Sequence, residues 1–133
     1  MVIIPYRDSA RLRFGCLIIQ HHKILAVKDS RYSKLTLPGG KLECDETPNE
    51  CFTRELKEEL NCEFQSARFF GAYVSKENGI DRINAAFIVK IKGDPQPNSE
   101  IERIEWLTAK DIDKFGPVTA KIVQDAINKQ LIR

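Results

Sequence analysis

Residues 37–62 have the sequence LPGGKLECDETPNECFTRELKEELNC, which predicts a tight glycine turn, a short loop and then a helix. Thr47 is a residue type preferred at the N-cap, Pro48 suits the first helical position, and Glu50 completes a capping box. Asn61 suits the left-handed residue that ends many helices. The expected helix therefore begins after Thr47 and ends at Asn61.

One face of this helix combines an apolar stripe with carboxylates. At about 100° per residue, Phe52, Leu56 and Leu60 fall on a single stripe. Three glutamates fall on or beside that stripe: Glu55, Glu58 and Glu59. Like charges at this spacing oppose helix formation by about 0.2–0.5 kcal/mol per pair. A hard divalent cation would reverse this penalty, because carboxylate oxygens suit Mg²⁺ or Mn²⁺.

A solvated acidic helix face is the common alternative to a metal site. Arg54 and Lys57 lie in the same helix and would neutralise part of the charge. Helix periodicity alone therefore favours the solvated face. The positions of the charged residues relative to the glycine turn favour the metal site.

Those positions resemble the signature of the Nudix hydrolases, the MutT-like pyrophosphohydrolases. The signature has Gly, five residues, Glu, seven residues, then Arg-Glu, an aliphatic residue, any residue, Glu-Glu, any residue, Gly and an aliphatic residue. Gly40, Glu46 and residues 54–60 (RELKEEL) stand at the matching positions. The chain departs from the signature only at Asn61-Cys62, which replaces Gly and the aliphatic residue. Every charged position is intact.

The resemblance implies Mg²⁺- or Mn²⁺-dependent hydrolysis of a nucleoside diphosphate linked to another moiety. Such a displacement depends mainly on positioning and charge neutralisation, and a metal ion lowers the pKa of the attacking water. The resemblance assigns metal ligation to the Gly39 carbonyl, Glu55, Glu58 and Glu59, with Arg54 orienting a carboxylate.

The general base stays open between two glutamates. Members of the family use either the glutamate after the signature arginine, here Glu55, or a carboxylate from a later loop. Glu100 is the later candidate, as base and as metal ligand, and Glu102 is the alternative. Glu46 is expected to support the loop before the helix.

The rest of the chain alternates expected strands and helices. The expected strands are residues 14–20, 24–28, 63–75, 82–92 and 100–107, with a hairpin turn at Asn78-Gly79. Residues 108–114 and 117–132 are expected to be helical. This order predicts an α/β or α+β sandwich, and the resemblance implies a mixed β-sheet between helices.

Composition limits the classes of protein. The 133 residues suit a single domain spanning 1–133, and a net charge of +2 gives no argument for nucleic-acid or membrane binding. No apolar run approaches the ~20 residues of a membrane span. The four cysteines form no CxxC pair, which argues against zinc and favours reduced thiols in a cytoplasm.

The substrate is the least constrained expectation. Arg31 and Lys34 lie in a polar loop that either contacts substrate phosphate or is simply solvated, and Phe115 is placed to stack on a base. Small size and missing subfamily markers favour a nucleoside triphosphate, hydrolysed to monophosphate and pyrophosphate. The alternatives are ADP-ribose, a nucleotide sugar or a dinucleotide, and a non-catalytic nucleotide sensor. A homodimer is left open.

Overall fold

The computed structural model of the chain describes residues 12–43 and 45–133. Its elements in chain order are β1 (Leu12–Leu17), β2 (Ile19–Gln20), β3 (Lys23–Asp29), β4 (Gly39–Lys41), α1 (Pro48–Leu60), β5 (Glu63–Glu77), β6 (Ile80–Lys92), β7 (Ile101–Leu107), the 3₁₀ helix η2 (Ala109–Lys114) and α2 (Pro117–Asn128).

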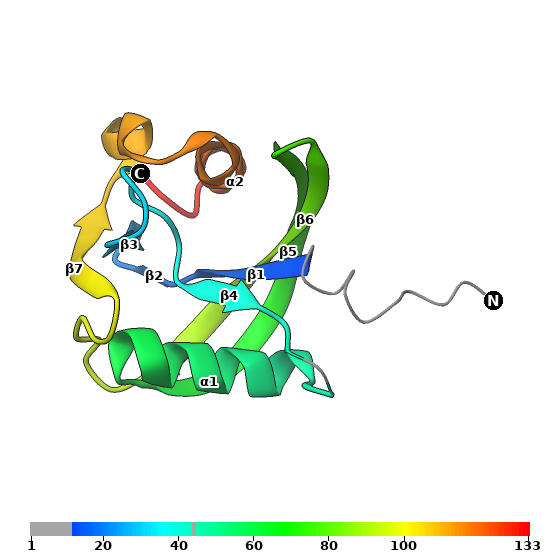
Figure 1. Ribbon diagram of the computed structural model, residues 1–133. Coiled ribbons are helices and arrows are strands. Elements are labelled where there is room, and N and C mark those ends of the chain that lie inside the picture. The colour runs from blue at the N-terminus through cyan, green and yellow to red at the C-terminus, as the bar shows by residue number, and fades with distance from the viewer. Residues whose placement is uncertain (1–11, 44) are drawn as a thin grey trace.

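The strands form two sheets, which lie between α1 and α2 (Figure 1). The larger sheet has the order β4-β1-β6-β5 and is mixed, because β1 runs parallel to β6 and antiparallel to β4. The smaller sheet has the antiparallel order β2-β3-β7. The expected α+β sandwich with a mixed sheet between helices is confirmed, and the second sheet is an addition to it.

Helix α1 has the expected ends. The Thr47 hydroxyl accepts a hydrogen bond from the Glu50 amide at 3.2 Å, and the Thr47 amide donates to the Glu50 carboxylate at 3.1 Å. Asn61 adopts the left-handed conformation with φ 49°. The helix is therefore fixed at both ends by contacts between neighbouring residues.

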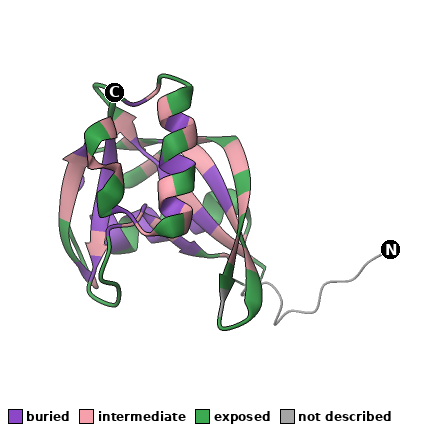
Figure 2. Cartoon of the chain, turned by 90° about the horizontal axis from the view of Figure 1, so that it is seen from above, coloured by how far each residue is buried: buried purple, intermediate pink, exposed green. Residues whose placement is uncertain are grey.

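A hydrophobic core lies on each side of the sheets. Phe52, Leu56 and Leu60 of α1 are buried against β1 and β3, and the Phe52 ring stacks on Phe14 at 5.5 Å. On the opposite side, α2 buries Ile122 against the other faces of these strands. Figure 2 shows α2 from above, lying over the strands, with buried and exposed residues alternating along it.

The last helix ends earlier than expected, at Asn128 instead of Ile132. Gln130 has a positive φ of 63°, and the Leu131 amide donates to the Ala126 carbonyl at 3.0 Å, so the chain turns back after the helix. Ile132 is still only 1% exposed. Its apolar character therefore reflects packing in the core rather than continuation of the helix.

The hairpin turn and the cysteines agree with the sequence. The hairpin turn between β5 and β6 has positive φ at both Asn78 and Gly79. Within the described ranges, Cys16, Cys51 and Cys62 are free, buried thiols. No helix in those ranges combines the length and the apolar content needed to cross a membrane.

Candidate active site

Glu59 is the most deeply buried carboxylate of α1. Its side chain is 4% exposed, and its Oε1 accepts a hydrogen bond from the Gly39 amide at 2.8 Å. Burial raises the pKa of Glu59 to about 8, against the effect of the Gly39 hydrogen bond. Gly39 has φ 141°, and a Cβ there would lie 2.0 Å from the Phe14 carbonyl oxygen. Only glycine therefore brings β4 this close to both β1 and Glu59.

Two carboxylates from other elements join Glu59. Asp29 at the end of β3 and Glu100 in the turn before β7 bring their oxygens within 4.8 Å of one another and of Glu59. The pairing of β3 with β7 produces this approach, since Asp29 pairs with Ile101 and the Ser30 amide donates to the Glu100 carbonyl at 2.9 Å. We call Asp29, Glu59 and Glu100 the carboxylate cluster.

Arg31 lies against the carboxylate cluster. Its Nε and Nη2 donate to the two carboxylate oxygens of Asp29 at 2.9 and 2.6 Å, and Nη2 lies 3.5 Å from Glu100. These hydrogen bonds hold the pKa of Asp29 below its usual range. The Arg31 side chain is nevertheless 60% exposed, so it is free to exchange these partners.

Arg54 organises a second group of acidic residues. Its Nη1 donates to Glu55 at 2.7 Å, and the guanidinium also lies 3.7 Å from Glu58. Burial raises the pKa of Glu55, although the bond to Arg54 opposes this. A Cβ at Gly40 would lie 2.4 Å from Glu55 Oε1, so the second glycine makes room for this carboxylate. Glu58 is 54% exposed.

Glu46 holds Arg54 from the other side. The Glu46 carboxylate accepts from Arg54 Nε at 2.8 Å and from Nη2 at 2.9 Å, a bidentate pair. These bonds lower the pKa of Glu46 to about 2. Its carboxylate also accepts from the Glu43 amide at 2.9 Å, which ties the loop before α1 to the helix.

The donor set of the carboxylate cluster fits a hard divalent cation. Three carboxylates lie close together, and the pKa of one of them, Glu59, is raised because burial and its acidic neighbours penalise the anion. Oxygen ligands of this kind are those that Mg²⁺ and Mn²⁺ prefer. A divalent cation would relieve the repulsion that the cluster carries without it.

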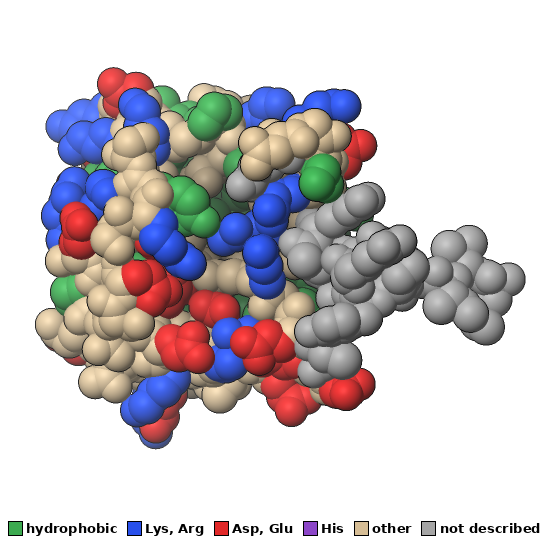
Figure 3. All heavy atoms as spheres, viewed as in Figure 1, with side chains coloured by type: hydrophobic (Ala, Val, Ile, Leu, Met, Phe, Trp, Pro, Cys, Tyr) green, Lys and Arg blue, Asp and Glu red, His purple; other side chains and the backbone are tan. Residues whose placement is uncertain are grey.

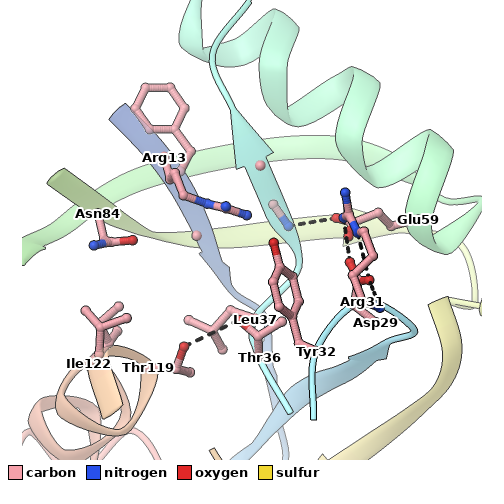
Figure 4. Close-up of a pocket in the computed structure, with 15 residues that line it drawn as sticks. Arg13, Asp29, Arg31, Tyr32, Thr36, Leu37, Glu59, Asn84, Thr119 and Ile122 are labelled. Atoms are coloured by element: carbon pink, nitrogen blue, oxygen red, sulfur yellow. Dashed lines mark hydrogen bonds and ion pairs between the residues drawn. The ribbon is translucent and has the colours of Figure 1, made fainter. Parts of the chain in front are cut away.

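A cavity of about 500 Å³ opens beside the carboxylate cluster. We call it the cationic cavity, because four cationic side chains are among its lining residues: Arg13, Arg31, Lys34 and Arg82. A smaller cavity of about 60 Å³, lined by both Glu59 and Arg13, joins it to the cluster (Figure 4). On the face shown in Figure 3, acidic and basic side chains gather on adjoining areas around a hollow.

The structure brings together only part of the residue set expected from the sequence. Glu59 and Glu100 meet in the carboxylate cluster, whereas Glu55 and Glu58 lie with Arg54 beside it. The Gly39 amide contacts Glu59. Glu102 is exposed on β7.

Only two of the three expected substrate-binding residues lie at the cationic cavity. Arg31 and Lys34 line the cationic cavity. Phe115 does not: it is 4% exposed in the core beneath α2, where its backbone bridges to Leu35, so its ring is unavailable for stacking on a base. The neighbouring Gly116 lines the cavity in its place.

Three charged residues of the site were not predicted from the sequence: Asp29, Arg13 and Arg82. Asp29 ends a strand, Arg13 is the second residue of another and Arg82 is the third residue of β6, so none of them belongs to a local motif. The sequence indicated only that Asp29 stands at the start of a polar loop. Their positions follow from strand pairing, which joins Asp29 to β7 and Arg13 to Asn84 of β6.

Fold and site together define an α+β protein with a candidate cation site beside a cationic cavity. The profile of the NUDIX domain matches residues 9–126, most of the chain. The chain therefore belongs to the Nudix hydrolase family, whose enzymes act on the pyrophosphate bonds of nucleoside diphosphate derivatives and generally use a divalent metal.

Individual relatives are distant. A MutT-like protein of Streptomyces ambofaciens is 28% identical over 118 residues, which cover 86% of this chain and 74% of that protein. The NAD-capped RNA hydrolase NudC of Vibrio vulnificus is 29% identical over 130 residues, 90% of this chain but only 47% of NudC. The MutT Nudix hydrolase of Burkholderia pseudomallei superposes with a TM-score of 0.75 at 21% identity, covering 86% of this chain and 95% of that one.

Proposed function

We propose that this protein is a Mg²⁺- or Mn²⁺-dependent pyrophosphohydrolase that converts a nucleoside triphosphate to its monophosphate and pyrophosphate. The observation that carries the proposal is the convergence of Asp29, Glu59 and Glu100 within 4.8 Å of one another, next to the cationic cavity. Water would attack one phosphorus of the diphosphate, the bond from that phosphorus to the bridging oxygen would break, and the bridging oxygen would leave with the other phosphate.

The acidic residues would hold the cation and accept the proton. Asp29, Glu59 and Glu100 would hold the metal, with Glu55, Glu58 and the Gly39 carbonyl as further ligands by analogy with the family. A bound divalent cation neutralises phosphate oxygens and lowers the pKa of the attacking water.

Between the two candidate bases, the contacts favour Glu55. Burial raises the pKa of Glu55, whereas a hydrogen bond from Ser99 lowers that of Glu100, and a base is most effective when its pKa approaches the working pH. Arg54 would keep the Glu55 carboxylate in one orientation through its 2.7 Å bond. Glu100 then acts as a ligand in this proposal.

The basic side chains would bind the substrate phosphates. Arg31 lies between the carboxylate cluster and the cationic cavity, and Arg13 and Lys34 line the cavity beyond it. Guanidinium and ammonium groups form charge-assisted hydrogen bonds to phosphate oxygens. The chain thus supplies positive charge on the side of the diphosphate away from the acidic residues.

A dinucleotide or a capped RNA end is the second candidate substrate. The similarity to NudC favours it, although the match spans 47% of that protein. An RNA substrate would overturn the expectation that the chain has no nucleic-acid partner. A homodimer and a cytoplasmic location remain predictions.

A substrate screen tests the proposal. The purified chain is incubated with nucleoside triphosphates, ADP-ribose, nucleotide sugars, dinucleotides and NAD-capped RNA in millimolar Mg²⁺ or Mn²⁺, and products are separated by chromatography. We expect monophosphate and pyrophosphate from a triphosphate, and none of either when EDTA is present. Release of orthophosphate instead, or turnover that persists in EDTA, would contradict the proposal. Nucleotide binding without turnover would favour a sensor.

A further inference from the structure

We infer that the cationic cavity binds a phosphate group outside the scissile diphosphate, so that the preferred substrates carry at least three phosphates. This inference rests on the proposed function and narrows it. It favours nucleoside triphosphates, dinucleoside polyphosphates and nucleotides with an additional phosphate monoester. It disfavours ADP-ribose and nucleotide sugars, whose phosphates are both used at the scissile bond.

The first argument is the charge of the cavity wall. Four cationic side chains line it, and no aspartate or glutamate is among its lining residues in the described ranges. Arg31 is paired with Asp29. Arg13 has no carboxylate partner among the described residues, and the Lys34 ammonium donates only to the Asp113 carbonyl, at 3.3 Å. The positive charges of Arg13 and Lys34 are therefore not compensated by a carboxylate of the described residues.

The second argument is the way strand register gathers donors on one face of the sheet. Arg13 of β1 pairs with Asn84 of β6, and Arg82 lies two residues before Asn84 on the same face. Ser75 of β5 pairs with Arg82, and its hydroxyl accepts from the Asn84 side-chain amide at 3.0 Å. Three adjacent strands thus present polar side chains to the cationic cavity, and two of these side chains, Arg13 and Asn84, also line the smaller cavity drawn in Figure 4.

The third argument is continuity with the carboxylate cluster. The 60 Å³ cavity is lined by Glu59 and Gly39 at one side and by Arg13 and Asn84 at the other, and Arg31 lines both cavities. A diphosphate held at the cluster would therefore extend directly into the cationic cavity. The cavity volume of about 500 Å³ lies in the range of ordinary ligand sites.

An uncharged group in this cavity would leave its cations without a counter-charge. Covering Arg13 and Lys34 with a neutral sugar would remove water from them and supply no anion in return, which is unfavourable. A phosphate supplies three acceptor oxygens and negative charge, which suit guanidinium donors. The wall is thus complementary to a phosphorylated group.

Matched pairs of compounds that differ by one phosphate test the inference. Suitable pairs are a nucleoside triphosphate and its diphosphate, NADP and NAD, and coenzyme A and dephospho-coenzyme A. We expect kcat/KM to favour the member with the third phosphate by about tenfold or more in at least one pair, as for one charged hydrogen bond. Equal turnover within every pair, or a preference for ADP-ribose, would overturn the inference.

Substitutions of residues that line the cationic cavity test whether the preference for a third phosphate arises there. Arg13→Gln should remove most of it by raising KM, whereas Arg13→Lys should retain part of it. Lys34 lies in an exposed loop, so Lys34→Gln should fold even if Arg13→Gln does not, and it should likewise reduce the preference for the third phosphate. Arg68→Gln is the matched control, because Arg68 is exposed on β5 and does not line the cavity. An unchanged preference in both Arg13→Gln and Lys34→Gln would contradict the inference.

Binding measured without metal separates this inference from the proposed function. Calorimetry in EDTA gives the affinity for each pair independently of turnover. Tighter binding of the third-phosphate member without any hydrolysis in Mg²⁺ or Mn²⁺ would uphold the inference and refute the proposed function. Hydrolysis of both members of each pair, with equal affinity and equal kcat/KM, would uphold the proposed function and refute the inference.

Discussion

The acidic and the basic halves of the site are built in different ways. The acidic half rests on α1, where Arg54, Glu55, Glu58 and Glu59 fall within six consecutive residues. The basic half takes Arg13 from β1, Lys34 from a loop and Arg82 from β6. The difference shows that one capped helix can supply most of the carboxylates, whereas the cations meet only when the sheet has formed.

The largest effect is expected from Glu59→Gln, which removes charge from the centre of the acidic half. The amide keeps the shape and the bond to Gly39 but binds a hard cation poorly. We expect metal affinity to fall and kcat to drop by about 100- to 1,000-fold, comparable to the loss of an electrostatic group at a reaction centre. Metal titration and steady-state kinetics measure both quantities.

Glu63→Gln is the matched control for this substitution, because Glu63 is an exposed residue at the start of β5. The same loss of activity in the control would point to a general effect of charge. Full activity and unchanged metal affinity in Glu59→Gln would show that the carboxylate cluster neither binds the metal nor takes part in the reaction.

Glu46→Gln tests whether the acidic half depends on the loop before α1. The pair with Arg54 is largely buried, so its loss should lower the free energy of unfolding at pH 7 by about 1–3 kcal/mol. The folded pKa of about 2 lies below the ordinary 4.5, so this stabilisation is complete above about pH 4.5 and is lost as pH falls toward 2. Urea unfolding at pH 7 and pH 3 should therefore show a smaller difference between variant and wild type at pH 3. An equal difference at both pH values would contradict this assignment.

Arg31→Gln tests the boundary between the two halves. Arg31 occupies both oxygens of Asp29, so it competes with a metal ion for this carboxylate. We expect the variant to bind Mn²⁺ about three- to tenfold more tightly without nucleotide, as for loss of a partly exposed ion pair, while KM for substrate rises. Electron paramagnetic resonance titration measures the Mn²⁺ affinity. Lys34→Gln should raise KM alone, and weaker Mn²⁺ binding in Arg31→Gln would refute the competition.

The sequence predicted what depends on neighbouring residues. The capping box at Thr47, the left-handed Asn61 and the buried stripe through Leu56 all depend on spacing within one helix, and all are confirmed. The hairpin at Asn78 was found for the same reason, because its turn type needs positive φ at two adjacent positions.

What the sequence did not predict depends on register and packing between distant elements. Asp29 becomes part of the carboxylate cluster only because β3 pairs with β7, and Arg13 faces the cavity only because β1 pairs with β6. Phe115 was expected at the substrate, but an aromatic residue between two elements is as easily buried in the core. The extent of α2 was misjudged because the apolar Ile132 packs in the core beyond the end of the helix.

The smallest effect is expected at Asn61, where the chain departs from the family signature. Asn61 ends α1 with φ 49°, a conformation that costs an L-residue more than glycine, and its backbone N–H donates to the carbonyls of Leu56 and Lys57. Asn61→Gly relieves the backbone strain but gives the unfolded chain more freedom, so we expect a net change within about 1 kcal/mol. Asn61→Ala keeps the strain without the asparagine side chain and should destabilise by about 1 kcal/mol. Thermal unfolding compares the three proteins, and kcat should be unchanged in Asn61→Gly because the helix end lies beyond the carboxylates. A large loss of activity in Asn61→Gly would mean that the asparagine side chain itself contributes to the site, beyond its role in ending α1.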